Sequence, residues 1–288
     1  MRKRLRVRTP AKINLYLRVV GKRPDGYHEL ETLFQAIDLM DELVLTKASG
    51  DTRLVSPGYP ELETEQNLVL KALNWVEKAV DSPLHVHIHL TKRIPLGGGL
   101  GGGSSDAAAT LIGLCELYDL PLDDSMLHRA ALELGADVPF FLLGGTAIGQ
   151  GIGEILTAVD ISTEYALVLI NPGFPVSTAR VFREFSTSLT DNPGRGTLWG
   201  LLNAGKSLES FLHNDLQETT ERLYSEVREI REFLEHFDVR GVLMSGSGPT
   251  VFAIVEPDNK ITDQMKKTVP TGWTMLEINP LTHGPEID

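Results

Sequence analysis

Apolar and polar residues alternate along residues 5–20, the first segment of the chain with a clear pattern. One face of this segment is apolar and consists of Leu5, Val7, Ala11, Ile13, Leu15, Leu17 and Val19. The opposite face is polar and consists of Arg6, Arg8, Lys12, Asn14, Tyr16 and Arg18. Because successive side chains of a strand point to opposite faces, the pattern predicts a half-buried strand with one strongly polar face.

Predicted strands and amphipathic helices follow one another along the rest of the chain. Apolar runs and alternation predict strands over 30–46, 84–94, 164–173 and 272–280, and a glycine-rich hairpin over 144–159. Helical spacing predicts helices over 64–80, 104–118, 124–135, 177–185 and 258–269, and one or two helices over 207–237. Residues 239–256 should form a strand, a glycine turn and a second strand or helix, whereas 21–30 and 190–197 are predicted loops.

The pattern changes character near residue 158, which divides the chain into two α+β halves. We expect a first domain over residues 1–157 and a second over residues 158–288. The chain has 288 residues, of which 42% are hydrophobic, so it is long enough to bury the cores of one large or two medium domains.

Charge and cysteine content exclude several classes of protein. The formal net charge is −12 at pH 7, which argues against binding of nucleic acid or an anionic membrane through the whole surface. The single cysteine, Cys115, permits no intrachain disulfide and fits a reducing compartment. No apolar segment approaches the length that spans a bilayer, so we expect a cytoplasmic protein. A phosphate ligand would therefore need positive charge that is placed locally.

A glycine-rich loop is the strongest chemical signal. The segment PLGGGLGGGSSD, from Pro95 to Asp106, lies between a predicted strand and a predicted helix. Backbone amides without side chains can surround a phosphate, and the start of the helix adds positive potential. The phosphate-loop lysine of G-x-x-x-x-G-K-[ST] is missing. A dinucleotide-binding G-x-G-x-x-G can also be read here, although Lys92–Pro95 separates it from the strand.

Three other places could contribute to a site, and each has a structural alternative. Lys12 and Asn14 share the polar face of the first strand, where they could simply be solvated. Asp137, in LGADVPFF, could cap a helix or act as a base that faces the glycine loop. Gly246 and Gly248, in MSGSGPTVFAIVE, form either a tight turn or a second approach of the backbone to an anion.

We expect no metal site held by the protein alone. His85, His87 and His89 fall on one strand face, but alternation makes that unavoidable. No cysteine or carboxylate joins them at the spacing of metal ligands.

Taken together, these motifs resemble those of a known superfamily. PLGGGLGGGSSDAAA resembles the phosphate loop of the GHMP kinases, and SGSGPTVFAI resembles their C-terminal glycine motif. TPAKINLYLRVVGKRPDGYHELETLFQAIDL and GADVPFFLLGGTAIGQGIGE resemble one branch more narrowly. The substrate of that branch is a cytidine diphosphate ester of methylerythritol. The resemblance runs from Thr9 to about Glu256.

The resemblance implies a two-domain α+β GHMP kinase fold with the active site in the cleft. The N-terminal domain would be ribosomal-S5-like α/β, and the C-terminal domain ferredoxin-like α+β. The implied reaction moves the γ-phosphoryl group of ATP to the 2-hydroxyl of the methylerythritol unit, in the non-mevalonate isoprenoid pathway. Mg²⁺ would be carried mainly by the nucleotide phosphates, and the protein would be a monomer or homodimer with no nucleic-acid or membrane partner.

The resemblance also assigns site residues. The implied catalytic pair is Lys12 and Asp137, of which Asp137 would accept or orient the hydroxyl proton. The implied ATP-binding residues are Asn67, Lys92, Pro95, Leu96, Gly97, Gly98, Gly99, Leu100, Gly101, Gly102, Gly103, Ser104 and Ser105. The implied substrate-binding residues are Asn14, Tyr27, His28, Phe182, Gly246 and Ser247. Tyr27 and Phe182 would sandwich the cytosine ring.

Three alternatives stay open at this point. Another GHMP kinase, of the homoserine or mevalonate type, would share the glycine loop but needs no aromatic pair. A dinucleotide-dependent oxidoreductase would use the G-x-G-x-x-G reading of the loop. A nucleotide-binding regulator without catalysis would not need both Lys12 and Asp137.

Overall fold

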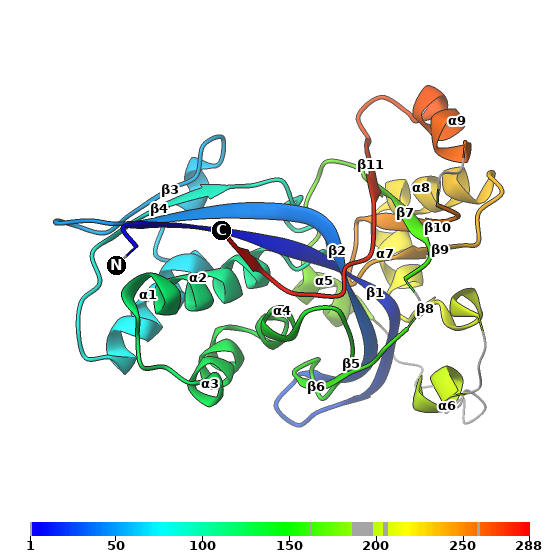
Figure 1. The fold of residues 1–288 in the computed structure, drawn as a ribbon. Coiled ribbons are helices and arrows are strands. Elements are labelled where there is room, and N and C mark those ends of the chain that lie inside the picture. The colour runs from blue at the N-terminus through cyan, green and yellow to red at the C-terminus, as the bar shows by residue number, and fades with distance from the viewer. Residues whose placement is uncertain (1, 162, 186–197, 204–206, 258–259) are drawn as a thin grey trace.

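Two long antiparallel strands, β1 (Arg4–Lys22) and β2 (His28–Lys47), form the backbone of the first sheet (Figure 1). The computed structural model describes residues 2–161, 163–185, 198–203, 207–257 and 260–288. Within this part of the chain the first sheet has eight strands in the order β12-β1-β2-β4-β3, with β5 and β6 attached through β2 and β8 attached through β1. Its other members are β3 (Arg53–Val55), β4 (Val86–Thr91), β5 (Thr146–Gln150), β6 (Ile155–Ala158), β8 (His213–Asn214) and β12 (Glu286–Ile287).

Four helices lie on one face of this sheet (Figure 1). They are α1 (Leu68–Ala79), α2 (Gly102–Tyr118), α3 (Asp124–Leu134) and α4 (Val138–Leu143), preceded by the short 3₁₀ turn η1 (Pro60–Leu62). The central helix α2 lies directly on β1 and β2, because a Cβ added at Gly113 would come 2.6 Å from Leu45 Cδ1. Helices predicted over 64–80, 104–118 and 124–135 are confirmed.

A second sheet is built entirely from antiparallel pairs in the order β11-β7-β10-β9. Its strands are β7 (Ala166–Asn171), β9 (Gly241–Met244), β10 (Val251–Val255) and β11 (Thr274–Ile278). The accompanying helices are α5 (Thr178–Glu184), α6 (Leu198–Asn203), η2 (Leu208–Phe211), α7 (Gln217–Leu223), α8 (Ser225–Glu235) and α9 (Ile261–Thr268). The predicted loop at 190–197 lies outside the described residues.

The continuous apolar run of β7 is explained by burial on both faces. Val168 and Ile170 pack with Val227 and Ile230 of α8 in one core cluster. Leu167 and Leu169 face the other way, into a cluster shared with the first sheet. A strand covered on both faces loses the alternation of a half-exposed strand. The two sheets are thus joined by a common apolar core.

Strand β1 departs from the half-buried strand that its sequence predicts. The register shifts at a β-bulge between Pro10 and Ala11, and the strand is buried on both faces from Thr9 to Tyr16. Before the bulge, Val7 packs in the core beneath α2, whereas Ile13, beyond it, packs in the core between the sheets. Across this step the partner on β2 jumps from Met40 to Ile37, so two residues of β2 oppose no residue of β1, and the apolar side chains of β1 change faces. The prediction of a solvated polar face is therefore wrong for the middle of the strand.

The end of the chain returns to the first sheet, which the sequence did not predict. After β11 the backbone runs back beside β2, where Leu281 N donates to Ala36 O at 2.8 Å. Strand β12 then pairs with β1, with Val7 opposite Ile287 (Figure 1). The sequence boundary near residue 157 thus leaves a tail that packs with the first half. No helix in the described ranges is both long and apolar enough to cross a membrane.

Candidate active site

A cavity of about 940 Å³ lies where the first sheet, the glycine loop and the second half of the chain meet. The cleft-facing residues of β1 and β2 form one wall, and the glycine loop forms another. Helix α5 and the turn Ser245–Gly248 close it from the second half. The shared core between the two sheets fixes these walls relative to one another.

The glycine loop, Pro95–Gly103, is docked by its backbone on the turn Ser245–Gly248. The Ser245 hydroxyl donates to Gly99 O at 2.9 Å. Gly99 has a φ of +76°, and a Cβ there would lie 2.3 Å from Ser245 O. Only glycine combines this conformation with so close an approach. The two glycine motifs that stand far apart in the sequence therefore form one continuous wall.

Helix α2 presents uncapped backbone amides to the cavity. Its N-cap is Gly101, with a φ of +72°, which has no side chain to accept a hydrogen bond from the first turn. The helix begins at Gly102, so Ser104 and Ser105 lie inside the first turn and do not cap it. Free amides and the positive end of the helix dipole together make an anion-binding position.

Lys12 carries its charge into the cavity from the middle of β1. Its Nζ donates to Asn14 Oδ1 at 2.7 Å and to Gly99 O at 3.2 Å, and it lies 5.4 Å from the centre of the Phe34 ring. Only 5% of the side chain is exposed. Burial lowers the pKa of Lys12 below its ordinary value, and the nearby Asp137 carboxylate opposes that shift.

Asp137 faces Lys12 instead of capping its own helix. Its Oδ2 lies 3.7 Å from Lys12 Nζ, and 35% of its side chain is exposed. Asp137 occupies the N-cap position of α4, yet its side chain makes no capping hydrogen bond. This geometry favours the functional interpretation of Asp137 over the alternative of a helix cap.

Asn14 connects the Lys12 ammonium to the adjacent strand. Its Nδ2 donates to Thr32 Oγ1 at 2.8 Å, and the Thr32 hydroxyl donates to Tyr16 O at 2.6 Å. The Asn14 amide nitrogen is engaged by Thr32, so the Asn14 oxygen is held toward Lys12. The network fixes the ammonium in one position.

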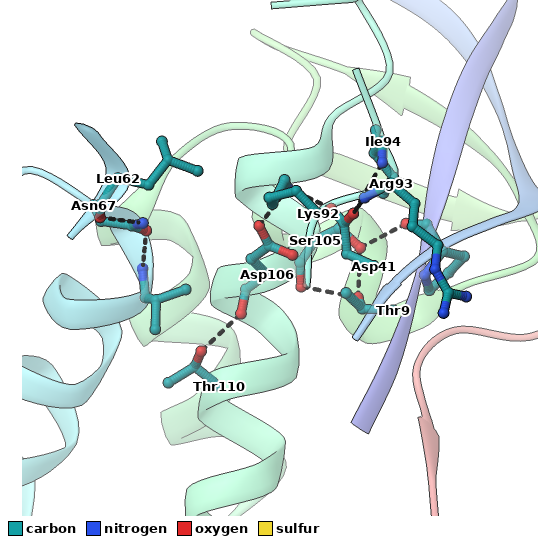
Figure 2. Close-up of polar contacts among 12 residues, drawn as sticks. Thr9, Asp41, Leu62, Asn67, Lys92, Arg93, Ile94, Ser105, Asp106 and Thr110 are labelled. Atoms are coloured by element: carbon teal, nitrogen blue, oxygen red, sulfur yellow. Dashed lines mark hydrogen bonds and ion pairs between the residues drawn. The ribbon is translucent and has the colours of Figure 1, made fainter. Parts of the chain in front are cut away.

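Lys92 lies at the cavity wall but is held from behind by two carboxylates (Figure 2). Its Nζ bonds to Asp41 Oδ2, and to Asp106 Oδ2 at 2.6 Å. Both carboxylates raise the pKa of Lys92, against the effect of burial. Its side chain is 1% exposed, so this lysine cannot move freely toward a ligand.

Aromatic residues gather at the mouth of the cavity. The His28 ring stacks on Phe182, with centroids 5.1 Å apart and an angle of 23° between the planes. Tyr27 is 61% exposed beside them. Burial and the charge of Lys22 lower the pKa of His28, which keeps its ring neutral and suited to stacking. The structure thus places the three predicted residues at one end of the site.

The turn Ser245–Gly248 is held by a residue that sequence reasoning missed. Asn214 Nδ2 donates to Met244 O and to Gly246 O, each at 2.8 Å. A Cβ at Gly246 would lie 3.4 Å from Lys12 Nζ, so the turn passes directly over the ammonium. Nothing in the local sequence FLHNDL distinguishes Asn214, because its partners come from distant strands.

Three of the predicted nucleotide-binding residues do not line the cavity. The Asn67 side chain caps α1, accepting from Val69 N and donating to Leu62 O (Figure 2). The Leu100 side chain is buried in the core between the sheets. The Ser105 hydroxyl donates to Pro10 O and is fully buried. The other predicted residues all lie on the cavity wall.

Comparisons with known proteins find similar sequences in one family of kinases. A family model described as "GHMP kinases N terminal domain" matches residues 67–145, and "GHMP kinases C terminal" matches residues 199–271. The 4-diphosphocytidyl-2-C-methyl-D-erythritol kinase of Syntrophus aciditrophicus is 41% identical over 256 residues, which cover 89% of this chain and 91% of that protein. The kinase of the same name from Geobacter metallireducens is 38% identical, with 97% and 99% covered.

The solved structures that resemble this chain include kinases as well. A crystal structure of 4-(cytidine 5'-diphospho)-2C-methyl-D-erythritol kinase has a TM-score of 0.77 and 35% identity, and covers 95% of this chain and 99% of its own. A homoserine kinase from Cytophaga hutchinsonii has a TM-score of 0.79 at 19% identity, with 100% and 98% covered. At 19% identity, the homoserine kinase shows similarity of fold alone.

The contact between Lys12 and Asp137 should affect how Lys12 titrates. Replacing Asp137→Asn removes the charge that opposes the effect of burial, so the pKa of Lys12 should fall further. At pH values between the lowered pKa of Lys12 in the folded protein and its ordinary pKa in the unfolded chain, folded Lys12 binds fewer protons than unfolded Lys12. The free energy of unfolding therefore rises with pH in that window, and the window should widen in the variant.

Nuclear magnetic resonance of lysine labelled at Cε and Nζ measures this shift at Lys12 itself. Asp123→Asn is the matched control, because Asp123 caps α3 and its carboxyl contacts Ser125 and Met126. It should leave the titration of Lys12 unchanged. An unaltered Lys12 titration in the Asp137→Asn protein would contradict the pairing.

Proposed function

Since this chain belongs to the 4-diphosphocytidyl-2-C-methyl-D-erythritol kinase family of GHMP kinases, we propose that it uses ATP to phosphorylate 4-diphosphocytidyl-2-C-methyl-D-erythritol. The γ-phosphoryl group goes to the 2-hydroxyl of the methylerythritol unit, a step of the non-mevalonate isoprenoid pathway. The observation that carries the proposal is the Lys12–Asp137 pair, 3.7 Å apart, beside a glycine loop and uncapped helix amides.

The nucleotide phosphates are proposed to bind the glycine loop and the first turn of α2. The amides there donate hydrogen bonds to anionic oxygens without any side chain in the way. No three His, Cys, Asp or Glu side chains of the described chain gather where they could hold a metal ion. The amides of the glycine loop and of the first turn of α2 fit a nucleotide that brings its own Mg²⁺, and the ion would neutralise phosphate charge.

The acceptor hydroxyl is proposed to bind between Lys12 and Asp137. Asp137 Oδ2 takes the hydroxyl proton as the new oxygen–phosphorus bond forms, and the bond from phosphorus to the β-phosphate oxygen breaks to release ADP. Lys12 stabilises the negative charge that develops on the attacking oxygen. Asn14 holds Lys12 in position for this task.

The cytosine ring is proposed to stack at the aromatic mouth of the cavity. In this structure Phe182 stacks on His28, and Tyr27 is exposed and can close over a base. Backbone groups near His28 would read the hydrogen-bonding edge of the base. Gly246 and Ser247, which line the cavity beside Lys12, would contact the part of the substrate that carries the hydroxyl.

The alternatives fit the site less well. The homoserine kinase shares the fold at 19% identity, and a homoserine substrate has no base for the aromatic mouth. The curated relatives and family models are those of kinases, which does not favour a dinucleotide-dependent oxidoreductase. Both Lys12 and Asp137 are in place, as a catalyst requires and a passive binder does not. We retain a cytoplasmic monomer or homodimer, without nucleic-acid or membrane partners, as part of the proposal.

Removal of the proposed base tests the mechanism. In the Asp137→Asn protein, phosphoryl transfer should slow by about 10²–10⁴-fold, because the hydroxyl proton has no acceptor. The affinity for ADP should change little, since Asp137 lies outside the glycine loop. The rate is measured as ADP release in a coupled assay, and the affinity by calorimetry.

Asp123→Asn, on the surface of the same half, should keep wild-type turnover and serves as the control. Near-normal turnover of the Asp137→Asn protein would exclude Asp137 as the base.

A second substitution tests recognition of the base. Phe182→Ala should raise KM for the cytidine substrate by about 5- to 100-fold, the range expected for one base–aromatic stack. KM for ATP should stay the same, because the Phe182 ring stacks on His28 and not on the glycine loop. Phe237→Ala is the matched control, since Phe237 packs on Phe233 and does not line the cavity. Equal effects of Phe182→Ala on both KM values would refute a role in stacking.

A further inference from the structure

Three buried charged side chains meet behind the glycine loop. Asp41 on β2 and Asp106 on α2 both bond to Lys92, which directly follows β4 (Figure 2). At most 3% of each of these side chains is exposed. Charges buried this deeply must balance one another, because water does not screen them.

The charges in this cluster do not balance when every group is ionised. Two carboxylates and one ammonium leave a net charge of −1. Asp41 is fully satisfied, since its Oδ1 also accepts from Arg93 N at 2.5 Å and from Ile94 N at 2.9 Å. In the described chain, Asp106 Oδ1 is buried and has no hydrogen-bond partner. Asp106 is therefore the member whose negative charge is least supported.

A proton on Asp106 resolves this imbalance. The protonated carboxyl is neutral and can donate a hydrogen bond, so that Lys92 and Asp41 remain a matched pair. Burial raises the pKa of Asp106, Lys92 opposes the shift, and the nearby Asp41 adds to it, so that the pKa is raised to about 7. Among the described residues, the charged groups that shift the pKa of Asp106 are Lys92 and Asp41.

The cluster lies directly under the proposed phosphate position. A Cβ added at Gly102 would come 3.2 Å from Lys92 Nζ. Gly102 is the first residue of α2, whose uncapped amides face the cavity, and both Gly102 and Lys92 line the cavity wall. A negative charge at Asp106 would therefore act on bound phosphates through low-dielectric protein.

We propose that Asp106 is a positioning residue for the nucleotide, which acts through Lys92 and takes up a proton when the phosphates bind. The proton comes from solvent and forms a bond to a carboxylate oxygen of Asp106, and no other bond changes. Lys92 is then held by Asp41 beneath the first turn of α2, as a single positive charge behind the amides. This inference rests on the proposed function, since it requires a nucleotide at the glycine loop.

The direction of the pH dependence follows from linkage. Anionic phosphates nearby favour the neutral carboxyl, so Asp106 binds its proton more tightly in the complex than in the free protein. The affinity for nucleotide should therefore fall as pH rises above about 7, by at most about tenfold per pH unit. Below pH 7 the free protein already carries the proton, and the dependence should vanish.

Calorimetry measures the proton directly. Mg²⁺-saturated ADP is titrated into the full-length protein at pH 7 and pH 8, in pairs of buffers that differ in their enthalpy of ionisation. We expect uptake of up to about half a proton at pH 7, rising toward one at pH 8. Asp106→Asn should abolish this uptake and make the affinity independent of pH. Any proton exchange that remains with the Asp106→Asn protein measures the protons exchanged by the nucleotide itself.

Asp119→Asn is the matched control, because it makes the same change at the exposed C-terminal end of α2. It should behave as the wild type. Uptake that is absent from the wild type, or equal in the Asp106→Asn protein, overturns the inference while nucleotide binding still supports the proposed function. Failure of the wild type to bind ADP refutes the proposed function instead.

If Asp106→Asn does not fold, the carboxyl resonances of ¹³C-labelled aspartate in the wild type decide the question. One buried aspartate should titrate near pH 7 in the free protein and at higher pH with ADP. Absence of such a resonance contradicts the proposal.

Discussion

The backbone contact between Gly99 and the turn Ser245–Gly248 is the constraint on which the rest of the site depends. It brings a loop from the first half of the chain against a turn of the second sheet, with no space for a Cβ between them. The Lys12 ammonium is inserted at this junction, bonded to Gly99 O and covered by Gly246. A loop that would be flexible by itself thus becomes a rigid wall with a charge behind it.

The two buried lysines of the site show how surroundings decide the use of a charge. Lys12 has one partly exposed carboxylate at 3.7 Å, and its pKa is lowered by burial. Lys92 has two buried carboxylates, which raise its pKa. The first ammonium is weakly compensated and available to a reacting oxygen, whereas the second is fully engaged in supporting the helix start. Together they supply the positive charge that the glycine loop lacks in its own sequence.

Local patterns predicted most of the fold and part of the site. The helices at Leu68–Ala79 and Asp124–Leu134 follow from apolar spacing and caps that lie within the same segment. The burial of Lys12 did not follow, because the register of β1 shifts between Pro10 and Ala11 and its apolar side chains change faces there. Asn214, Asp41 and β12 also escaped prediction, since their partners lie far away in the sequence. Alternation records neither a bulge nor a distant partner.

Transfer of a phosphoryl group to a cytidine-bearing alcohol is the function that we propose for the cleft. The most direct measurement is ³¹P nuclear magnetic resonance of the wild-type protein with Mg²⁺, ATP and 4-diphosphocytidyl-2-C-methyl-D-erythritol, in parallel with homoserine and mevalonate. We expect loss of the γ-phosphate signal and growth of one phosphomonoester signal, only with the cytidine substrate. A phosphomonoester formed only from homoserine or mevalonate, or release of inorganic phosphate alone, would contradict it.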